Sequence, residues 1–201
     1  MTLFRLAVSA ALMAGVVLAA AAGRPHAETV AAVTSHGAAL IAPKHDVTVL
    51  DGETLRIGDT DLRLSGVTAP ALRQQCVRDR RVEPCGETAA QAVQKIIDLA
   101  VKPVECRPEA DGGALCFVDG RDVGEALVLQ GRAVAADDRY AEAEAQARKA
   151  KLGLWASAWV PPDQWRRGAR MPEELAARSR LPAADRKPDV VLRPVSPASA
   201  D

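Results

Sequence analysis

Two carboxylates that flank a single glycine are the first residues of this chain whose types and spacing could do chemistry. Asp51 and Glu53 lie on either side of Gly52, and Arg63 follows ten residues after Glu53. Carboxylate oxygens are suitable ligands for a hard cation, and a guanidinium fork matches the oxygens of a phosphate. Asp51-Gly52 is equally the sequence of an ordinary hairpin turn, and Arg63 is equally consistent with a solvated, outward-facing side chain.

The stretches around these residues have the alternation of short strands. Val47 to Leu50 and Thr54 to Ile57 are predicted to pair around the Asp51-Gly52 turn. Asp61 to Val67 continues the alternation, with leucines on one face and Arg63 on the other. These three short strands predict a meander.

The remaining pattern predicts a helix, a hairpin and two further helices, in that order. A helix is expected from Gly86, with an apolar stripe, and Pro103 would stop it. Strands are expected at 104–106 and 114–118, followed by a short helix that ends at Gly131 and a third helix over 139–152. Residues 72–84 are interpreted as a charged loop. The order predicts an α+β fold: a five-stranded, partly open barrel of the oligonucleotide-binding type with about three helices.

Both ends of the chain differ in composition from the middle. Residues 1–27 have the charge and apolar run of a secretory signal, with cleavage expected after Ala22 or Ala27. An uncleaved N-terminal anchor is the alternative. We expect a linker over 28–44, one domain over 45–167 and a disordered tail rich in Pro, Ala and Arg over 168–201. The mature protein is expected in the periplasm or outside the cell, with no transmembrane segment after cleavage.

Export makes the cysteines informative. The chain has four, Cys76, Cys85, Cys106 and Cys116, and an even number in an exported protein suggests two disulfides. Three connectivities are possible. Nearness in sequence favours Cys76–Cys85 and Cys106–Cys116. Zinc is not expected, because no ligands are paired at the short spacing of C-x-x-C.

The overall charge of the chain argues mildly against tight binding to nucleic acid. Its 26 basic residues are balanced by 26 acidic residues, whereas proteins that neutralise many phosphates usually carry a basic excess. We therefore expect any nucleic-acid binding to be weak. A local basic patch remains compatible with this composition.

Several segments occur in the order that is typical of the thermonuclease, or staphylococcal-nuclease-like, family, and the chain resembles exported bacterial members of it. The resemblance covers about residues 45–167. Its segments are 49–55, 63–70, the helix after Cys85-Gly86, 118–123, 125–128 with Gly131, 144–149, 153–155 and Trp165-Arg166. The resemblance implies an oligonucleotide-binding-type barrel. It also implies calcium-dependent hydrolysis of phosphodiesters in DNA and RNA.

The family's metal ligands fall on altered residues of this chain. The first ligand aspartate corresponds to Glu53, which keeps the charge but adds a methylene. Asp51 corresponds to the opening aspartate of the turn motif. The second ligand aspartate corresponds to Thr68, and the residue that offers a backbone carbonyl corresponds to Ala69. The resemblance thus leaves Glu53 and Asp51 as the candidate calcium ligands.

The groups that act on the substrate are altered as well. The general-base glutamate corresponds to Ala71, and the second of two phosphate-binding arginines corresponds to Asp111. The first arginine is retained as Arg63, with a phosphate-stabilising role if the protein is active.

Three functional hypotheses follow. The first is an inactive or strongly weakened member that acts as a binding module outside the cytoplasm. The second is an active nuclease with a rearranged metal site made of Asp51, Glu53 and Asp111, assisted by Arg63. The third is a structural module associated with the cell envelope. Nothing in the sequence predicts the oligomeric state.

Overall fold

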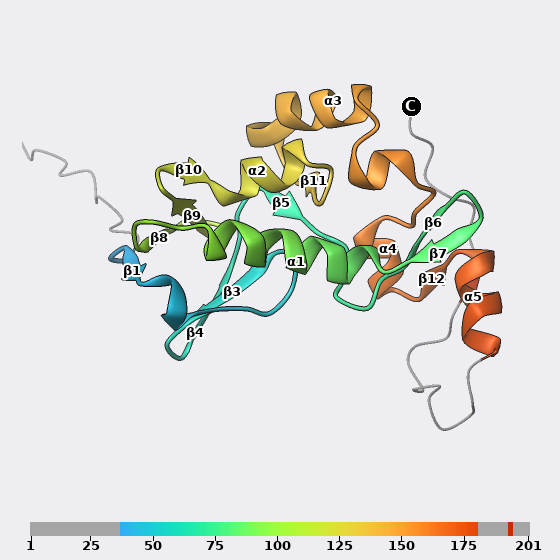
Figure 1. The fold of residues 1–201 in the computed structure, drawn as a ribbon, viewed down its shortest axis with the longest axis horizontal. Coiled ribbons are helices and arrows are strands. Elements are labelled where there is room, and N and C mark those ends of the chain that lie inside the picture. Colours follow the sequence, from blue (N-terminus) through green and yellow to red (C-terminus); the bar gives the residue numbers. More distant parts are fainter. Residues whose placement is uncertain (1–36, 181–192, 195–201) are drawn as a thin grey trace, which may run out of the picture. The chain divides into compact units, whose positions relative to one another are not determined.

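The predicted meander forms a small antiparallel sheet. The computed structural model describes residues 37–180 and 193–194. Its first meander consists of β2 (Val47–Val49), β3 (Thr54–Ile57) and β4 (Thr60–Arg63), paired in that order (Figure 1). Leu55 lies opposite Leu62, and both are buried. The period-two alternation therefore places the leucines inside and leaves Arg63 exposed.

A second antiparallel sheet has four strands. In spatial order these are β1 (Leu40–Ala42), β8 (Val104–Pro108), β9 (Ala114–Val118) and β10 (Arg121–Asp122). Cys106 and Cys116 lie directly opposite each other and form a disulfide. The predicted strands β8 and β9 are confirmed. β1 falls in the stretch interpreted as a linker and is ordered because it pairs with β8.

Three further strand pairs complete the strands of the described residues. They are β5 (Val67–Thr68) with β11 (Val134–Ala135), β6 (Cys76–Arg78) with β7 (Arg81–Glu83), and β12 (Ala169–Arg170) with β13 (Arg193–Pro194). A single bridge from Leu64 to Ala114 links the end of the meander to β9. The mixed α+β class is confirmed, but the pairings within residues 37–180 do not trace a closed barrel of five strands.

Five α-helices occur in the described residues, against about three expected. They are α1 (Cys85–Asp98), α2 (Val123–Leu129), α3 (Ala141–Lys149), α4 (Pro162–Arg166) and α5 (Pro172–Ser179), with short 3-10 turns at Lys44–Asp46, Asp138–Tyr140 and Gly153–Ala156. The first three match the predicted helices, although α3 is shorter at both ends. The prediction of disorder is wrong for the start of the C-terminal tail, where β12 and α5 are ordered.

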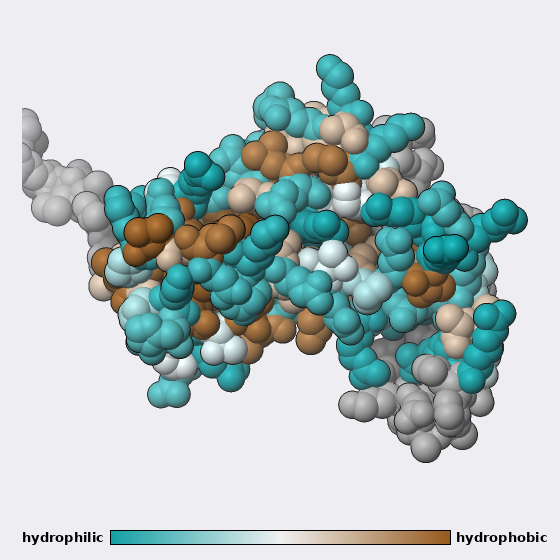
Figure 2. All heavy atoms as spheres, viewed as in Figure 1, coloured by the Kyte–Doolittle hydropathy of each residue, from teal (hydrophilic) through white to brown (hydrophobic). Residues whose placement is uncertain are grey.

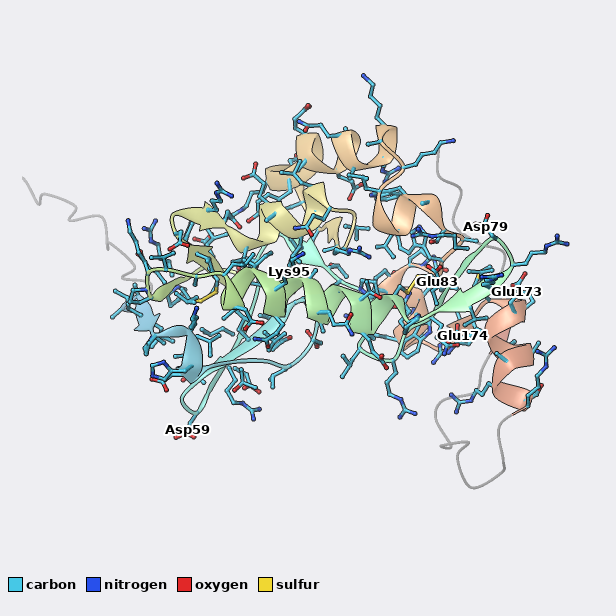
Figure 3. All side chains as sticks on the ribbon, in the orientation of Figure 1. Asp59, Asp79, Glu83, Lys95, Glu173 and Glu174 are labelled. Atoms are coloured by element: carbon cyan, nitrogen blue, oxygen red, sulfur yellow. A yellow bond between two sulfur atoms is a disulfide. The ribbon has the colours of Figure 1, made fainter. Side chains whose placement is uncertain are left out.

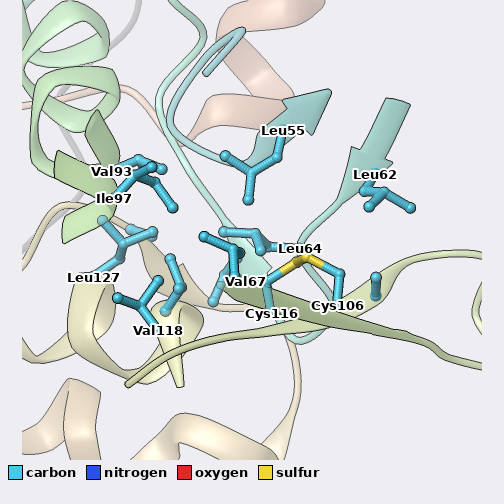
Figure 4. Close-up of a cluster of buried hydrophobic side chains, with 14 of the residues drawn as sticks. Leu55, Leu62, Leu64, Val67, Val93, Ile97, Cys106, Cys116, Val118 and Leu127 are labelled. Carbon is cyan, nitrogen blue, oxygen red and sulfur yellow. A yellow bond between two sulfur atoms is a disulfide. The ribbon is translucent and has the colours of Figure 1, made fainter. Parts of the chain in front are cut away.

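The core is aliphatic and sits between α1, α2 and the strands. Val93 and Ile97 of α1 are fully buried, as are Leu64 and Leu127 (Figure 4). A smaller cluster contains Trp155 and Trp159, whose rings meet edge to face at 5.5 Å, together with the buried Cys76. The scarcity of aromatic residues is therefore compensated by branched aliphatic side chains in the main core and by the tryptophans beside the β6–β7 hairpin.

The β6–β7 hairpin occupies the stretch that was interpreted as a loop. Its turn residues, Asp79 and Arg80, have positive φ angles of 49° and 63°, as the type I′ turn of a two-residue hairpin requires. Neither residue is glycine, so the turn lacks its usual sequence signal. Cys76, where β6 begins, is bonded to Cys85, where α1 begins, and this disulfide fixes the hairpin against the helix. Both disulfides match the favoured pairing.

The expected signal sequence lies outside the described residues. Within residues 37–180, no helix is long and apolar enough to cross a membrane. Two disulfides are typical of proteins in oxidising compartments.

Gly86 is a position where we expect substitution to disturb the fold. A Cβ at Gly86 would overlap the backbone carbonyl oxygen of Ala71, because the first turn of α1 packs directly on that loop. Gly86→Ala should lower the free energy of unfolding by about 1–3 kcal/mol, as overpacking does. Urea denaturation followed by circular dichroism measures the change. Gln91→Ala, at an exposed position of the same helix, should change it by less than about 0.5 kcal/mol. Equal stability of the two variants would contradict the close approach.

Candidate functional site

Asp51 is a turn residue in the structure. Its Oδ1 accepts a hydrogen bond of 2.8 Å from the backbone N–H of Glu53, which is the local turn that aspartate commonly makes. Gly52 between them is buried, and a Cβ there would lie 2.7 Å from the Cβ of Ala89 and 2.9 Å from that of Ala69. The glycine thus lets the turn pack against α1 and the chain after β5.

Glu53 is engaged through both carboxylate oxygens by donors of the protein itself. Oε1 accepts a hydrogen bond of 2.7 Å from Nη2 of Arg166, and Oε2 accepts one of 2.6 Å from the backbone N–H of Ala69. Arg166 is the last residue of α4 and lies 113 residues away in sequence. Its Nη2 also donates to the carbonyl oxygen of Ala69 at 3.3 Å. The Glu53 side chain is only 12% exposed, so water screens these contacts weakly.

This arrangement does not fit a calcium ion. Calcium takes six to eight oxygen ligands, and its ligand candidates here are already hydrogen-bonded: Glu53 and the Ala69 carbonyl to Arg166, and Asp51 to the turn. Thr68 lies within β5, opposite Val134. Within the described residues, no three His, Cys, Asp or Glu side chains gather closely enough to hold a metal. The rearranged site of Asp51, Glu53 and Asp111 is therefore not formed.

Arg63 lies beside a carboxylate. Its Nη2 is 4.0 Å from Oδ2 of Asp111, and both side chains are about half exposed. The other oxygen of Asp111 accepts hydrogen bonds from Oγ of Ser65 at 2.8 Å and from the backbone N–H of Gly113 at 2.9 Å. These hydrogen bonds, with a further contribution from the charge of Arg63, lower the pKa of Asp111 below its ordinary value. Hydrogen bonds thus hold the Asp111 carboxylate in place. The resemblance places a second arginine, of opposite charge, at this position.

The loop after Ala69 is held by a buried amide. Gln74 has no exposed surface. Its Oε1 accepts from the backbone N–H of Ala71 at 3.3 Å, and its Nε2 donates to the carbonyl of Val160 at 2.6 Å. The methyl side chain of Ala71 cannot transfer a proton, so the position that the resemblance assigns to the general base carries no acid–base group.

Two residues that organise this site, Arg166 and Gln74, are not predicted by the sequence patterns. Arg166 was noticed only as part of a segment that resembles the family, because nothing local links it to a carboxylate more than a hundred residues away. Gln74 lies in a stretch interpreted as a loop. Apolar neighbours would have suggested that Gln74 is buried, but Arg73 and Gln75 on either side of it are both polar. Long-range polar contacts of this kind leave no periodic signal.

Comparisons with known proteins agree with the resemblance. Residues 61–157 match the family described as "Staphylococcal nuclease homologue". The chain is also 28% identical over 151 residues to the "Succinoglycan biosynthesis protein ExoI" of Rhizobium meliloti (strain 1021), an alignment that covers 70% of this chain and 71% of that protein. Glu53 and Arg166 both lie outside the matched residues 61–157.

The pairing of Glu53 with Arg166 should contribute measurably to stability. Arg166→Ala would leave a nearly buried carboxylate with one hydrogen bond, and the free energy of unfolding should fall by about 1–2 kcal/mol. The value is below that of a fully buried pair because Arg166 is 41% exposed. Arg167→Ala is a matched control, since among the described residues Arg167 pairs only with the exposed Asp163, and it should change the free energy by at most about 0.5 kcal/mol. Equal losses would show that the contact with Glu53 contributes nothing specific.

Asp111 should make stability depend on acid pH. A carboxylate with a lowered folded-state pKa stabilises the fold above its unfolded pKa of about 4 and loses that contribution as pH falls through the folded value. Asp111→Asn should therefore lose less stability between about pH 5 and about pH 2 than the unmodified protein. Thermal melting across this range measures it. The control is Asp59→Asn, at the exposed tip of the β3–β4 turn (Figure 3), which should retain the pH dependence of the unmodified protein. If the stability of Asp111→Asn changes with pH in parallel with that of Asp59→Asn, the role of Asp111 is contradicted.

Proposed function

Because this chain contains a domain of the staphylococcal nuclease homologue family, we propose that it is a non-catalytic or strongly weakened member that acts as a binding module. The observation that carries the proposal is the engagement of both Glu53 oxygens by Arg166 and Ala69. An internal guanidinium supplies the positive charge that a bound cation would otherwise bring to this carboxylate.

The loss of acid–base and phosphate-binding groups supports the same proposal. A general base typically contributes about 10²–10⁴-fold to a rate, and Ala71 offers none. A donor that stabilises transition-state charge contributes about 10²–10³-fold, and Asp111 has the opposite charge. These factors are not additive. Together they would still remove much of an enzyme's advantage over the uncatalysed reaction.

The charge arrangement at Arg63 bears on nucleic-acid binding. Asp111 lies 4.0 Å from Arg63, so a phosphate that approached the guanidinium would meet a neighbouring negative charge. With no net charge on the chain, we propose that any binding to nucleic acid is weak and strongly reduced by salt. We further propose that the strands form the partly open barrel of the oligonucleotide-binding type, and that the two disulfides reflect export to the periplasm or the medium.

A role in polysaccharide biosynthesis is a second candidate function, and it is compatible with the first. The observation that favours it is the printed name of the relative, a succinoglycan biosynthesis protein that aligns with 70% of this chain. The identity of 28% is low, so the name suggests a class of process and no particular step. A domain without hydrolytic groups would serve such a process by binding.

The nuclease assay tests the first proposal. Full-length protein, purified with its disulfides intact, is incubated with single-stranded DNA and RNA at several calcium concentrations, beside Arg63→Ala. We expect no calcium-dependent cleavage above the buffer control, and no difference between the two proteins, because Ala71 offers no general base and Glu53, a candidate metal ligand, is engaged by Arg166. Turnover within about a hundredfold of an ordinary nuclease, abolished in Arg63→Ala, would overturn the proposal.

A further inference from the structure

A pocket of about 280 Å³ is formed largely by the C-terminal segment of the domain. One wall comes from loop residues 72–75, a second from Pro84 and the start of α1, and the third from the segment between Trp165 and Arg178. The third wall lies wholly outside the residues that match the family, 61–157. The pocket is therefore a feature of this C-terminal segment and is separate from the altered site around Glu53.

The third wall contains a buried carboxylate with one unsatisfied oxygen. Oε1 of Glu174 accepts a hydrogen bond of 3.0 Å from Nε1 of Trp165 and lies 3.3 Å from Nε of Arg170. Oε2 is buried and receives no hydrogen bond within the described residues. The Glu174 side chain is only 7% exposed, lines the pocket and lies on the inner side of α5 (Figure 3). A buried acceptor without a donor is unfavourable, so a donor that enters the pocket would satisfy it.

The negative charge of Glu174 is incompletely compensated. Burial raises the pKa of Glu174 above its ordinary value, and the hydrogen bond from Trp165 and the charges of Arg170 and Arg178 offset this only in part. An ammonium group at Oε2 would supply the missing hydrogen bond together with a positive charge. Charge-assisted hydrogen bonds are stronger than neutral ones, so an ammonium group suits this position better than an uncharged donor.

The pocket as a whole has an excess of positive charge. Its lining contains three arginines and two glutamates, namely Arg73, Arg170, Arg178, Glu87 and Glu174. Among the described residues, Arg73 and Glu87 have no hydrogen-bond or ion-pair partner, so both can engage a ligand. The surrounding surface over β6, β7 and α5 is mostly hydrophilic (Figure 2). A ligand that matches this lining carries a cationic donor for the buried oxygen and one negative charge in excess.

We propose that this pocket binds an acidic amino acid, aspartate or glutamate, with its ammonium group at Oε2 of Glu174 and a carboxylate at Arg73. Such a ligand has one ammonium group and two carboxylates, which balances the single arginine in excess. A guanidinium fork matches a carboxylate. The volume is near the lower end of the range for small-molecule sites and suits a single amino acid. The proposal goes beyond the role of a binding module and does not depend on the site around Glu53.

Nitrogen-15 NMR of the full-length protein tests the pocket, because the indole N–H of Trp165 donates to Glu174. The chain has three tryptophans, and Trp165→Phe identifies which indole signal belongs to the pocket. The protein is titrated with aspartate and glutamate, and separately with glutarate, glutamine and inorganic phosphate. We expect a saturable shift of the Trp165 signal with aspartate or glutamate at a Kd of about 1 mM or tighter. Glutarate lacks the ammonium group and glutamine lacks one carboxylate, so each should bind about tenfold or more weakly.

Matched variants locate the two ends of the ligand. Glu174→Gln should weaken the binding of the amino acid about tenfold or more without weakening that of glutarate, which has no group for Oε2. Arg73→Ala changes an exposed residue and should weaken the amino acid by about the same factor. Arg121→Ala, at an exposed position of β10 outside the pocket, should leave its affinity unchanged.

Four results would overturn the proposal. They are no shift with either amino acid at about 50 mM, binding of glutarate or phosphate as tight as that of the amino acid, equal weakening of glutarate and the amino acid by Glu174→Gln, and equal weakening by Arg73→Ala and Arg121→Ala. The nuclease assay concerns a different site. Cleavage of DNA by a protein that binds the amino acid would overturn the non-catalytic proposal alone, and an inactive protein without binding would overturn the pocket alone.

Discussion

The carboxylate of Glu53 is the point where three distant parts of the chain are joined. It lies at the end of the first hairpin turn, accepts the backbone N–H of Ala69 from the chain after β5, and pairs with Arg166 at the end of α4. A carboxylate that is 12% exposed requires such partners. These two contacts position the loop that follows Ala69 and bring the C-terminal segment against the hairpin, so the candidate site depends on them.

The site is electrostatically complete without a ligand. Glu53 has its cation in Arg166, and Arg63 has a carboxylate nearby in Asp111, which Ser65 and Gly113 hold in place. An enzyme that binds a metal and a phosphate keeps some charges uncompensated until those ligands arrive. Here the protein supplies the opposite charge at both positions, which supports the proposal of a non-catalytic or strongly weakened member.

Local patterns were enough to predict most of the secondary structure, and long-range contacts were not. Alternating leucines and the stripe on α1 marked β3, β4 and the helix, because burial imposes a period on the sequence. The β6–β7 hairpin is not predicted because Asp79 and Arg80 adopt positive φ angles although neither is glycine. Strand β1 is not predicted because it is formed by pairing with β8, which is distant in sequence. The altered residues Thr68, Ala71 and Asp111 could be predicted from the resemblance. The partners that compensate for them, above all Arg166, required the structure.

Calorimetric titration of calcium chloride into the full-length protein tests this account most directly. If the Arg166 guanidinium takes the place of a bound cation at Glu53, the unmodified protein will show only the heat of dilution. No saturable binding is expected up to calcium concentrations of several millimolar, roughly the weakest affinity of natural calcium modules. Saturable binding of one calcium ion per chain, lost in Glu53→Gln, would show that the carboxylate exchanges Arg166 for a metal, and it would contradict the account.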